Sequence, residues 1–222
     1  MSSTIESLAN EDLAFFGKVN ASISHELKNI LAIISEAAGL LNDLTEMAAM
    51  GQKIELELLK TCSQDIIEEI QRGFATVKQM NAFSHSVDDP VKKVNLADVV
   101  GLMIAIAKFL SFASKVQFDQ VPEEAPVVLT CPLRLQNLIY QSLVFAFESA
   151  GPDAQIRVRI PPQRDGSAYI TFSGLGSSHG RSFASDEIKK IAASIGVDIR
   201  ETSNVESFEL VVPENAEACC KP

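Results

Sequence analysis

The sequence predicts an α+β protein in which a long N-terminal helical hairpin precedes a smaller α/β sandwich. Three observations support this fold class. Apolar residues recur at gaps of three and four over the first part of the chain, as on one face of a long helix. Short apolar runs bounded by turn residues then alternate with amphipathic stretches. A hydrophobic content of 46% with 22% charged residues is typical of a folded chain.

A heptad pattern marks the first helix. The apolar positions alternate at gaps of four and three, which is the spacing of a helix that packs lengthwise against another helix. These positions are Ile23, Leu27, Ile30, Ile34, Ala37, Leu41 and Leu44. With Asn10 as the N-cap, we expect the helix to run from about Asn10 to Ala49 and to end around Gly51.

A second amphipathic helix is expected from about Ile54 to Ser84. Its apolar face comprises Leu59, Ile66, Ile70, Val77 and Met80, widened by Ile67 and Phe74. A two-helix hairpin has nothing within itself to cover so wide a seam, so we expect two copies to pair as a homodimeric four-helix bundle. The alternative is that the hairpin packs against the C-terminal half of its own chain.

The remainder of the chain alternates strands and helices. We expect an apolar helix led in by an Asn95 cap, a polar hairpin turn at Gln163–Gly166, and a last helix closed by Gly196. The expected helices are 100–112, 132–149 and 185–195, and the expected strands are 115–118, 126–130, 155–160, 168–172, 197–201 and 208–212. The expected domains are 1–87 and 91–214, with a linker at Val87–Pro90 and a tail at 215–222.

The composition restricts the cellular location and the binding partners that we expect. A formal charge of −10 and a pI near 4.8 disfavour nucleic acid and anionic membranes as partners. No apolar run has the length of a membrane span, and the N-terminus lacks the regions of a signal peptide, so we expect a cytoplasmic protein. The cysteines are Cys62, Cys131, Cys219 and Cys220, and their spacing matches no metal site.

A polar cluster lies on the outer face of the first helix. His25 and Asn29 fall at heptad positions f and c, four residues apart, and therefore share one patch of surface. Glu26 lies beside them, at the edge of the apolar face of the helix. Spacing alone leaves two interpretations open, a solvated helical face that includes a histidine or a functional site.

The stretch from Ser24 to Leu31, Ser-His-Glu-Leu-Lys-Asn-Ile-Leu, resembles the H-box of sensor histidine kinases. That pattern, Ser-His-Glu-Leu/Ile-Arg/Lys-Asn/Thr-Pro-Leu, lies on the first helix of their dimerisation and phosphotransfer domain. Ile30 replaces the usual proline, so we expect no proline kink. Arg72–Ser84 resembles the end of the kinases' second helix, and Val94–Val100 the start of their ATPase-like domain. The resemblance covers roughly residues 12 to 213.

The nucleotide-binding motifs of the kinases are degenerate here. Where their N-box has two asparagines, this chain has Gln141 and Phe145, and a phenyl ring cannot ligate Mg²⁺. Their Asp-x-Gly-x-Gly box reads Phe172-Ser173-Gly174-Leu175-Gly176, so the acid that binds adenine is missing. No Gly-x-Gly precedes the expected last helix. We therefore expect no ATP binding and no bound cofactor or metal.

A phosphoacceptor helix without an ATP site resembles the dimeric histidine phosphotransferases of phosphorelays, which derive from kinases. The resemblance implies that His25 accepts a phosphoryl group from the aspartate of one response-regulator receiver domain and passes it to another. Glu26 would hold the imidazole tautomer or accept its proton, and the receiver would supply Mg²⁺. Ser22 and Lys28 would border the surface that binds the receiver.

Three alternatives remain open at the level of sequence. Asn29 stands where kinases with phosphatase activity orient a water, so a receiver phosphatase is one. An active kinase with an unorthodox nucleotide site is the second, and a non-catalytic adaptor that binds a receiver is the third. His179, beside two serines in a loop, lacks an acid placed to orient it, which disfavours a hydrolase.

Overall fold

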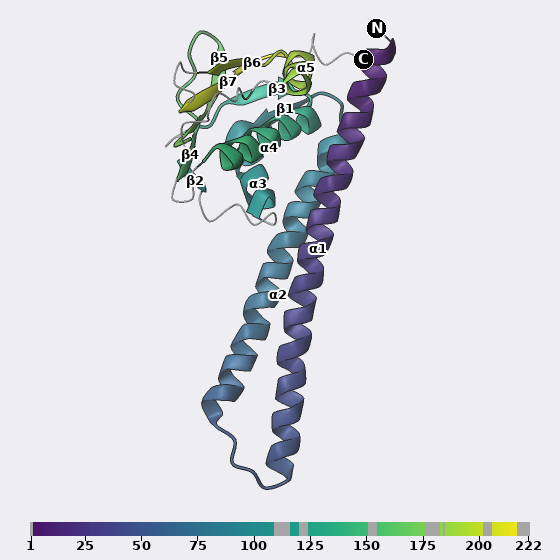
Figure 1. Cartoon of the computed structure of the whole chain (residues 1–222), viewed down its shortest axis with the longest axis vertical. Helices are drawn as coiled ribbons and strands as arrows, with labels where there is room; N and C mark the ends of the chain where they lie inside the picture. The colour runs from purple at the N-terminus through teal and green to yellow at the C-terminus, as the bar shows by residue number, and fades with distance from the viewer. Residues whose placement is uncertain are drawn as a thin grey trace. The chain divides into compact units, whose positions relative to one another are not determined.

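The computed structural model describes residues 2–108, 116–119, 124–150, 155–175, 183, 185–201 and 206–216 (Figure 1). The chain is α+β with long N-terminal helices, as predicted. The helices are α1 (Ser2–Ala49), α2 (Leu56–Ser84), the 3₁₀ turn η1 (His85–Val87), α3 (Leu96–Lys108), α4 (Pro132–Ser149) and α5 (Asp186–Ser194). The strands are β1 (Lys92–Asn95), β2 (Val116–Asp119), β3 (Val127–Thr130), β4 (Ile156–Arg159), β5 (Ser167–Ser173), β6 (Asp198–Glu201) and β7 (Ser207–Pro213).

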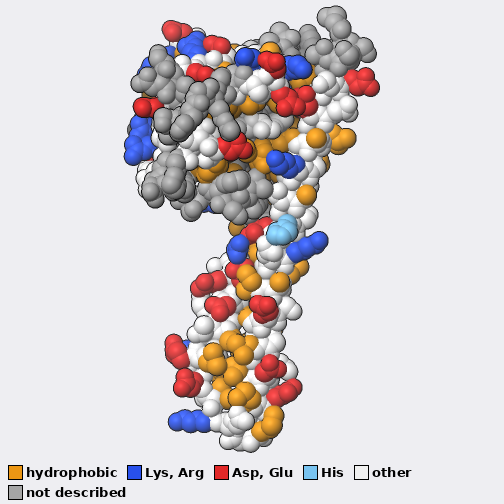
Figure 2. All heavy atoms as spheres, in the orientation of Figure 1, with side chains coloured by type: hydrophobic (Ala, Val, Ile, Leu, Met, Phe, Trp, Pro, Cys, Tyr) orange, Lys and Arg blue, Asp and Glu red, His pale blue; other side chains and the backbone are white. Residues whose placement is uncertain are grey.

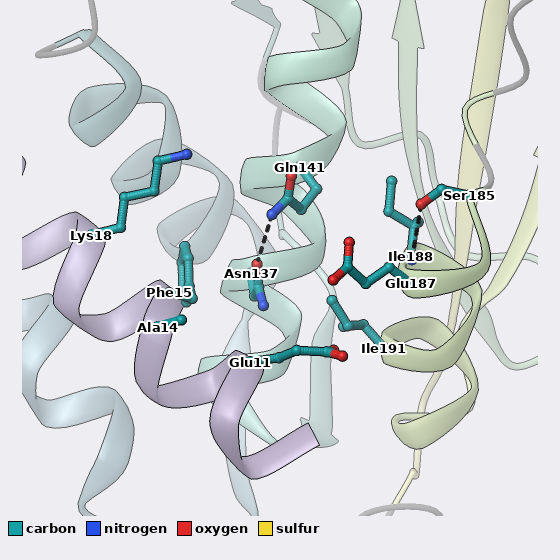
Figure 3. A pocket seen from close by; sticks show the side chains of 10 residues that line it. All are labelled: Glu11, Ala14, Phe15, Lys18, Asn137, Gln141, Ser185, Glu187, Ile188 and Ile191. Atoms are coloured by element: carbon teal, nitrogen blue, oxygen red, sulfur yellow. Dashed lines mark hydrogen bonds between the residues drawn. The ribbon is translucent and has the colours of Figure 1, made fainter. Parts of the chain in front are cut away.

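The chain divides into two compact units. One, here called the hairpin unit, is Asn20–Ala82. The other, here called the sheet unit, combines Met1–Val19 with Phe83–Pro222. In this division the first residues of α1 pack with the sheet unit, next to α4 and α5 (Figure 3). Phe15 is 5% exposed, and its ring lies 5.5 Å from that of Tyr140 on α4.

Helix α1 begins at Ser2 and not at Asn10, so the predicted N-cap was wrong. Residues 2–9 contain neither proline nor glycine, and nothing in them stops a helix from extending towards the N-terminus. The hydroxyl of Ser7 donates to Oε1 of Glu11 at 3.1 Å across one helical turn. Asn10 therefore lies inside the helix.

The predicted end of α1 is confirmed. Gly51 has φ +82°, a conformation that glycine adopts without steric cost. Its amide donates to the carbonyl of Ala48 at 3.0 Å, and the amide of Gln52 donates to that of Met47 at 3.1 Å. The bond from Gln52 to Met47 is the wide bond of a glycine-terminated helix, and it satisfies one of the last carbonyls.

Within the hairpin unit, α1 and α2 pack along the predicted seam. The buried d positions are Ile23, Ile30 and Leu44, with exposures of 0%, 2% and 5%. The a positions, Leu27, Ile34 and Leu41, are half-buried. A side chain at Gly73 of α2 would lie 3.6 Å from Cγ2 of Ile30, so the helices approach closely there.

The sheet unit contains a five-stranded sheet in the order β2-β4-β5-β7-β6 and a separate antiparallel pair, β1-β3. Strands β2 and β4 are parallel, and the other neighbours of the larger sheet are antiparallel. Helices α3, α4 and α5 pack in series, and α4 also contacts β5. The burial pattern of β5 alternates along the strand, with Ala168, Ile170 and Phe172 fully buried.

Local signals in the sequence set the helix and turn boundaries of this unit. Oδ1 of Asn95 accepts from the amides of Ala97 and Asp98 at 2.9 and 3.2 Å, so the predicted cap of α3 is confirmed. Asp165 and Gly166 both have positive φ in the turn before β5, as the polar hairpin turn predicted.

Helix α5 is also bounded as predicted. The hydroxyl of Ser185 accepts from the amide of Ile188 at 3.3 Å, and Gly196 with φ +66° follows the end of the helix. Helix α4 has the predicted bounds.

An ion pair between Asp12 and Arg134 predicts a pH dependence of stability. Nε of Arg134 donates to Oδ2 of Asp12 at 3.0 Å, and the side chains are only 16% and 17% exposed. Burial raises the pKa of Asp12 above 3.8, and Arg134 opposes that rise only in part. Between 3.8 and the raised pKa the folded state binds more protons than the unfolded state, so stability increases as pH falls through this window.

We therefore expect Asp12→Asn, which mimics the protonated side chain and still accepts from Arg134, to leave stability near pH 7 unchanged or higher. Urea unfolding at several pH values should show that the variant loses the rise on mild acidification. Asp43→Asn serves as the exposed control. A loss above about 1 kcal/mol near neutral pH would mean that the charge of Asp12 is needed to neutralise Arg134.

Candidate functional site

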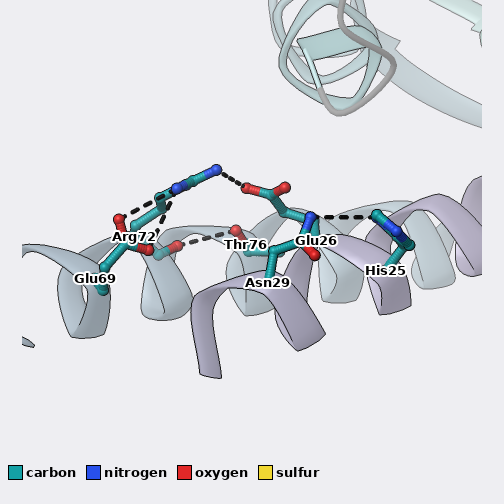
Figure 4. A network of polar contacts seen from close by, with 6 residues as sticks. All are labelled: His25, Glu26, Asn29, Glu69, Arg72 and Thr76. Atoms are coloured by element: carbon teal, nitrogen blue, oxygen red, sulfur yellow. Dashed lines mark hydrogen bonds and ion pairs between the residues drawn. The ribbon is translucent and has the colours of Figure 1, made fainter. Parts of the chain in front are cut away.

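The candidate site lies on the hairpin unit, around the exposed side chains of His25 and Asn29 (Figure 4). Nδ2 of Asn29 and Nδ1 of His25 are 3.3 Å apart, one helical turn along α1. An amide nitrogen can only donate, so in this contact Nδ1 accepts and the proton of a neutral ring lies on Nε2. The contact engages Nδ1, and among the described residues Nε2 of His25 has no hydrogen-bond partner. The outward orientation expected from the heptad register is confirmed.

Glu26, the acid next to the histidine, contacts α2 and not the imidazole. Its side chain is 10% exposed and forms an ion pair with Nη2 of Arg72. Arg72 also binds both oxygens of Glu69, at 3.2 and 3.3 Å, and its carbonyl accepts from the hydroxyl of the buried Thr76 at 2.9 Å. In this arrangement Glu26 joins the two helices, while Asn29 is the side chain that contacts the ring.

Sequence reasoning missed Arg72, because it lies 46 residues from Glu26 and no spacing rule connects them. Partial burial lowers the pKa of Arg72, but the carboxylates of Glu26 and Glu69 raise it, and the net direction is upward. Arg72 therefore stays cationic and compensates the buried charge of Glu26.

This ion pair predicts a measurable coupling between α1 and α2. Replacing Arg72 with leucine leaves the Glu26 carboxylate buried without a cation, and we expect a loss of about 1–3 kcal/mol in the free energy of unfolding. The double variant Arg72→Leu with Glu26→Gln should recover part of that loss. Denaturant unfolding of the four proteins measures the coupling. If the two single substitutions change the free energy of unfolding additively, the ion pair contributes nothing to stability. Glu69→Gln is the matched control.

The two residues expected to border the partner surface lie on the same helix. Ser22 is half-buried and Lys28 is exposed, each one turn or less from His25. Their position fits a surface around the histidine, and their role in binding a partner remains a prediction.

Phenylalanine rings occupy the positions that bind metal and adenine in the kinase pattern. Phe172 on β5 is fully buried and stacks on Phe208 of β7, with centroids 4.7 Å apart and planes 10° apart. Phe183 also stacks on Phe208, with ring centroids 4.3 Å apart. Phe145 on α4 lies 5.2 Å from Phe183 and 5.9 Å from Phe208. These four rings form an apolar cluster, and none of the four side chains offers an oxygen ligand for Mg²⁺ or an acceptor for an adenine amino group.

Of the remaining predicted nucleotide-site residues, Gln141 and Gly174 lie within the described part of the chain. Nε2 of Gln141 donates to Oδ1 of Asn137 at 3.5 Å, one turn earlier on α4. Gly174 has φ +82°, and a Cβ there would lie 2.1 Å from the carbonyl oxygen of Gln155. Close approach of two backbone segments thus explains this glycine without a ligand. Gly176, His179 and the Cys219–Cys220 pair lie outside the described residues.

Two further features bear on the site. Within the described ranges, no group of three or more His, Cys, Asp or Glu side chains is arranged to hold a metal ion. In the same part of the chain, none of the helices combines the length and the apolar character needed to cross a membrane.

No protein-family model and no curated protein matches this chain. Similar solved structures include the catalytic domain of histidine kinase ThkA, with 13% identity and a TM-score of 0.43 over 56% of this chain and 97% of that one. Acinetobacter baumannii histidine kinase AdeS has 9% identity and a TM-score of 0.45 over 80% and 95%. The ATP binding domain of PrrB from Mycobacterium tuberculosis has 14% identity and a TM-score of 0.42 over 57% and 97%. Similarity at this level concerns the path of the backbone only and assigns no role to any residue.

Proposed function

We propose that this protein is a phosphorelay histidine phosphotransferase, in which His25 accepts a phosphoryl group from a receiver aspartate and passes it to a second receiver. The observation that carries the proposal is an exposed imidazole within an H-box-like sequence, contacted through Nδ1 by Asn29. The phenylalanine cluster supports transfer without ATP, because it leaves no donor for nucleotide or metal at those positions.

The proposed reaction requires few catalytic groups from this chain. In the tautomer that carries its proton on Nδ1, the lone pair of Nε2 attacks the phosphorus of the aspartyl phosphate, the N–P bond forms, and the P–O bond breaks with its electron pair returning to the carboxylate. Nδ1–H then donates to the side-chain oxygen of Asn29, so the amide of Asn29 turns over relative to the contact described above. The second transfer reverses these events on another receiver. In this proposal the receiver supplies Mg²⁺ to neutralise the transferring group.

Phosphoryl transfer from receivers charged with acetyl phosphate is the decisive experiment. With Mg²⁺ present and no ATP, we expect label to move onto this chain as an acid-labile, alkali-stable adduct that peptide mapping places on His25. Loss of receiver phosphate without such an adduct would favour the phosphatase alternative. Labelling that requires ATP would favour a kinase, and no transfer or hydrolysis with any receiver would favour an adaptor.

We further propose that two hairpin units pair as a four-helix bundle. The hairpin exposes a series of large apolar side chains, visible in Figure 2 between acidic residues. On α1 they include Ile33, Leu40 and Met47, spaced seven residues apart, and on α2 Ile67, Ile70, Phe74 and Val77. A seven-residue repeat of exposed apolar side chains is typical of a helix that packs against further helices.

The proposed dimer predicts the effect of a charge on that face. Leu40 is 43% exposed, and we expect Leu40→Glu to weaken dimerisation by at least about tenfold, since a carboxylate would be buried in the seam. Sedimentation equilibrium measures the change. Leu13→Glu, at a 70% exposed position in the sheet unit, is the control and should leave association unchanged. A monomeric parent protein would rule the bundle out.

A further inference from the structure

Two acidic and two basic side chains lie near His25 on the hairpin unit. Glu26 is its neighbour in sequence, and Lys28 follows three residues later on the same helix. Arg72 binds Glu26 from α2, together with its second partner Glu69 (Figure 4). These four charges sum to zero, whereas the whole chain has a formal charge of −10. The surroundings of the histidine are therefore less negative than the molecule as a whole.

Arg72 is the cation that balances Glu26. Its Nη2 binds Oε1 of Glu26, while its Nη1 binds the two oxygens of Glu69 at 3.2 and 3.3 Å. The side chain of Glu26 is 10% exposed, so solvent and salt screen its charge less than they screen an exposed carboxylate. Loss of the charge of Arg72 would leave this carboxylate, one residue from His25, without its cation.

A phosphoryl donor approaches His25 as an anion, because negative charge is spread over the oxygens of the group that is transferred. A carboxylate without a cation beside the acceptor nitrogen would oppose that approach. Repulsion between like charges extends over about one Debye length, which is roughly 10 Å at an ionic strength of about 0.1 M. The charge of Arg72 should therefore matter for the rate at which an anionic donor reaches His25.

The ion pair between Glu26 and Arg72 also joins α1 to α2, and this structural role differs from the electrostatic one in what it predicts. A structural role alone would change the reaction of His25 with every reagent, whatever the charge of the reagent. An electrostatic role would affect anionic donors and would weaken as salt is added. The side chain of Arg72 is 48% exposed, so dissolved salt has access to its charge.

We propose that Arg72 is a positioning residue for phosphoryl transfer, which acts through Glu26 by compensating its charge so that an anionic donor can approach His25. The proposal rests on His25 as the phosphoryl acceptor, as in the proposed function. It can be tested without a receiver, because every anionic phosphoryl donor meets the same charges next to the histidine.

Phosphorylation of the whole chain by phosphoramidate, followed by peptide mass spectrometry, tests the proposal. The bond between Nε2 of His25 and phosphorus forms, and the P–N bond of phosphoramidate breaks with its electron pair leaving on ammonia. Arg72→Gln removes the charge but can still donate to Glu26, which favours retention of the helix pairing. We expect this variant to react about threefold more slowly at about 10 mM salt, and as fast as the parent near about 1 M salt.

Matched controls separate charge from structure. Diethyl pyrocarbonate is uncharged and should acylate His25 at the same rate in the parent and in Arg72→Gln. Arg72→Lys keeps the charge and should react with phosphoramidate like the parent, and adding Glu26→Gln to Arg72→Gln should restore most of the lost rate. His85, whose Nδ1 lies 2.6 Å from Oδ2 of Asp88, is the reference histidine and should be unaffected by these substitutions.

The outcomes distinguish this proposal from the proposed function. An unchanged phosphoramidate rate in Arg72→Gln, equal slowing with both reagents, or no phosphorylation of His25 in the parent would overturn the role of Arg72. A salt-dependent loss with phosphoramidate would support that role even if no receiver transfers a phosphoryl group to this chain. In that case the proposed function would be wrong, and the effect of Arg72 on anionic reagents at His25 would stand.

Discussion

Replacing His25 with glutamine abolishes phosphoryl acceptance in the proposed function, with an expected loss of at least about a thousandfold in transfer rate. The amide nitrogen of glutamine has no nucleophilic lone pair, while its size and polarity are close to those of histidine. Because His25 is exposed and its side-chain contact is with Asn29, we expect the fold to be unaffected. Rapid-quench transfer from a charged receiver measures the rate, and circular dichroism checks the helices.

Asn29→Ala separates transfer from hydrolysis. In the proposed function the side-chain oxygen of Asn29 accepts from Nδ1–H and so keeps the lone pair on Nε2. Alanine removes that acceptor, so we expect slower transfer, by about tenfold, with phosphohistidine still formed. If the protein instead hydrolyses receiver phosphate through a water on Asn29, this variant loses that activity and His25→Gln retains it. Inactivity of both variants in phosphate removal would exclude hydrolysis independent of the histidine.

The sequence predicted those features that depend on neighbouring residues. Asn95 as a cap, Gly51 as a helix end and the bounds of α4 each follow from a few adjacent side chains, and the structure confirms them. The predicted start of α1 was wrong, because a potential N-cap such as Asn10 does not prevent a helix from extending further towards the N-terminus when no proline or glycine precedes it.

The sequence did not predict the contacts that depend on tertiary packing. The ion pair between Glu26 and Arg72 joins positions far apart in the chain. The aromatic cluster includes Phe183 and Phe208, which belong to none of the kinase motifs. The motifs predicted that oxygen ligands were missing at Phe145 and Phe172. They contained no information on which side chains surround these two rings, because the neighbours depend on which strands and loops fold against α4 and β5.

Gly174→Ala should destabilise the sheet unit by roughly 2–5 kcal/mol, the largest effect on stability that we expect. The glycine has φ +82°, which disfavours any Cβ, and the added methyl would lie 2.1 Å from the carbonyl oxygen of Gln155. Backbone is on both sides of this contact, so relief requires movement of the start of β4 against the end of β5. Denaturant unfolding measures the loss.

Gly17→Ala is the matched control. Gly17 lies inside α1 with nothing within 4 Å of the added methyl, and alanine there should stabilise the chain by about 0.5–1 kcal/mol. The pair of variants tests why glycine stands at position 174, in the stretch that resembles the glycine box of the kinases. If Gly174→Ala unfolds the sheet unit, packing alone explains the glycine, and it gives no support to nucleotide binding. A stable Gly174→Ala protein would leave that glycine without a packing role, and titration of both proteins with Mg-ATP would then test nucleotide binding.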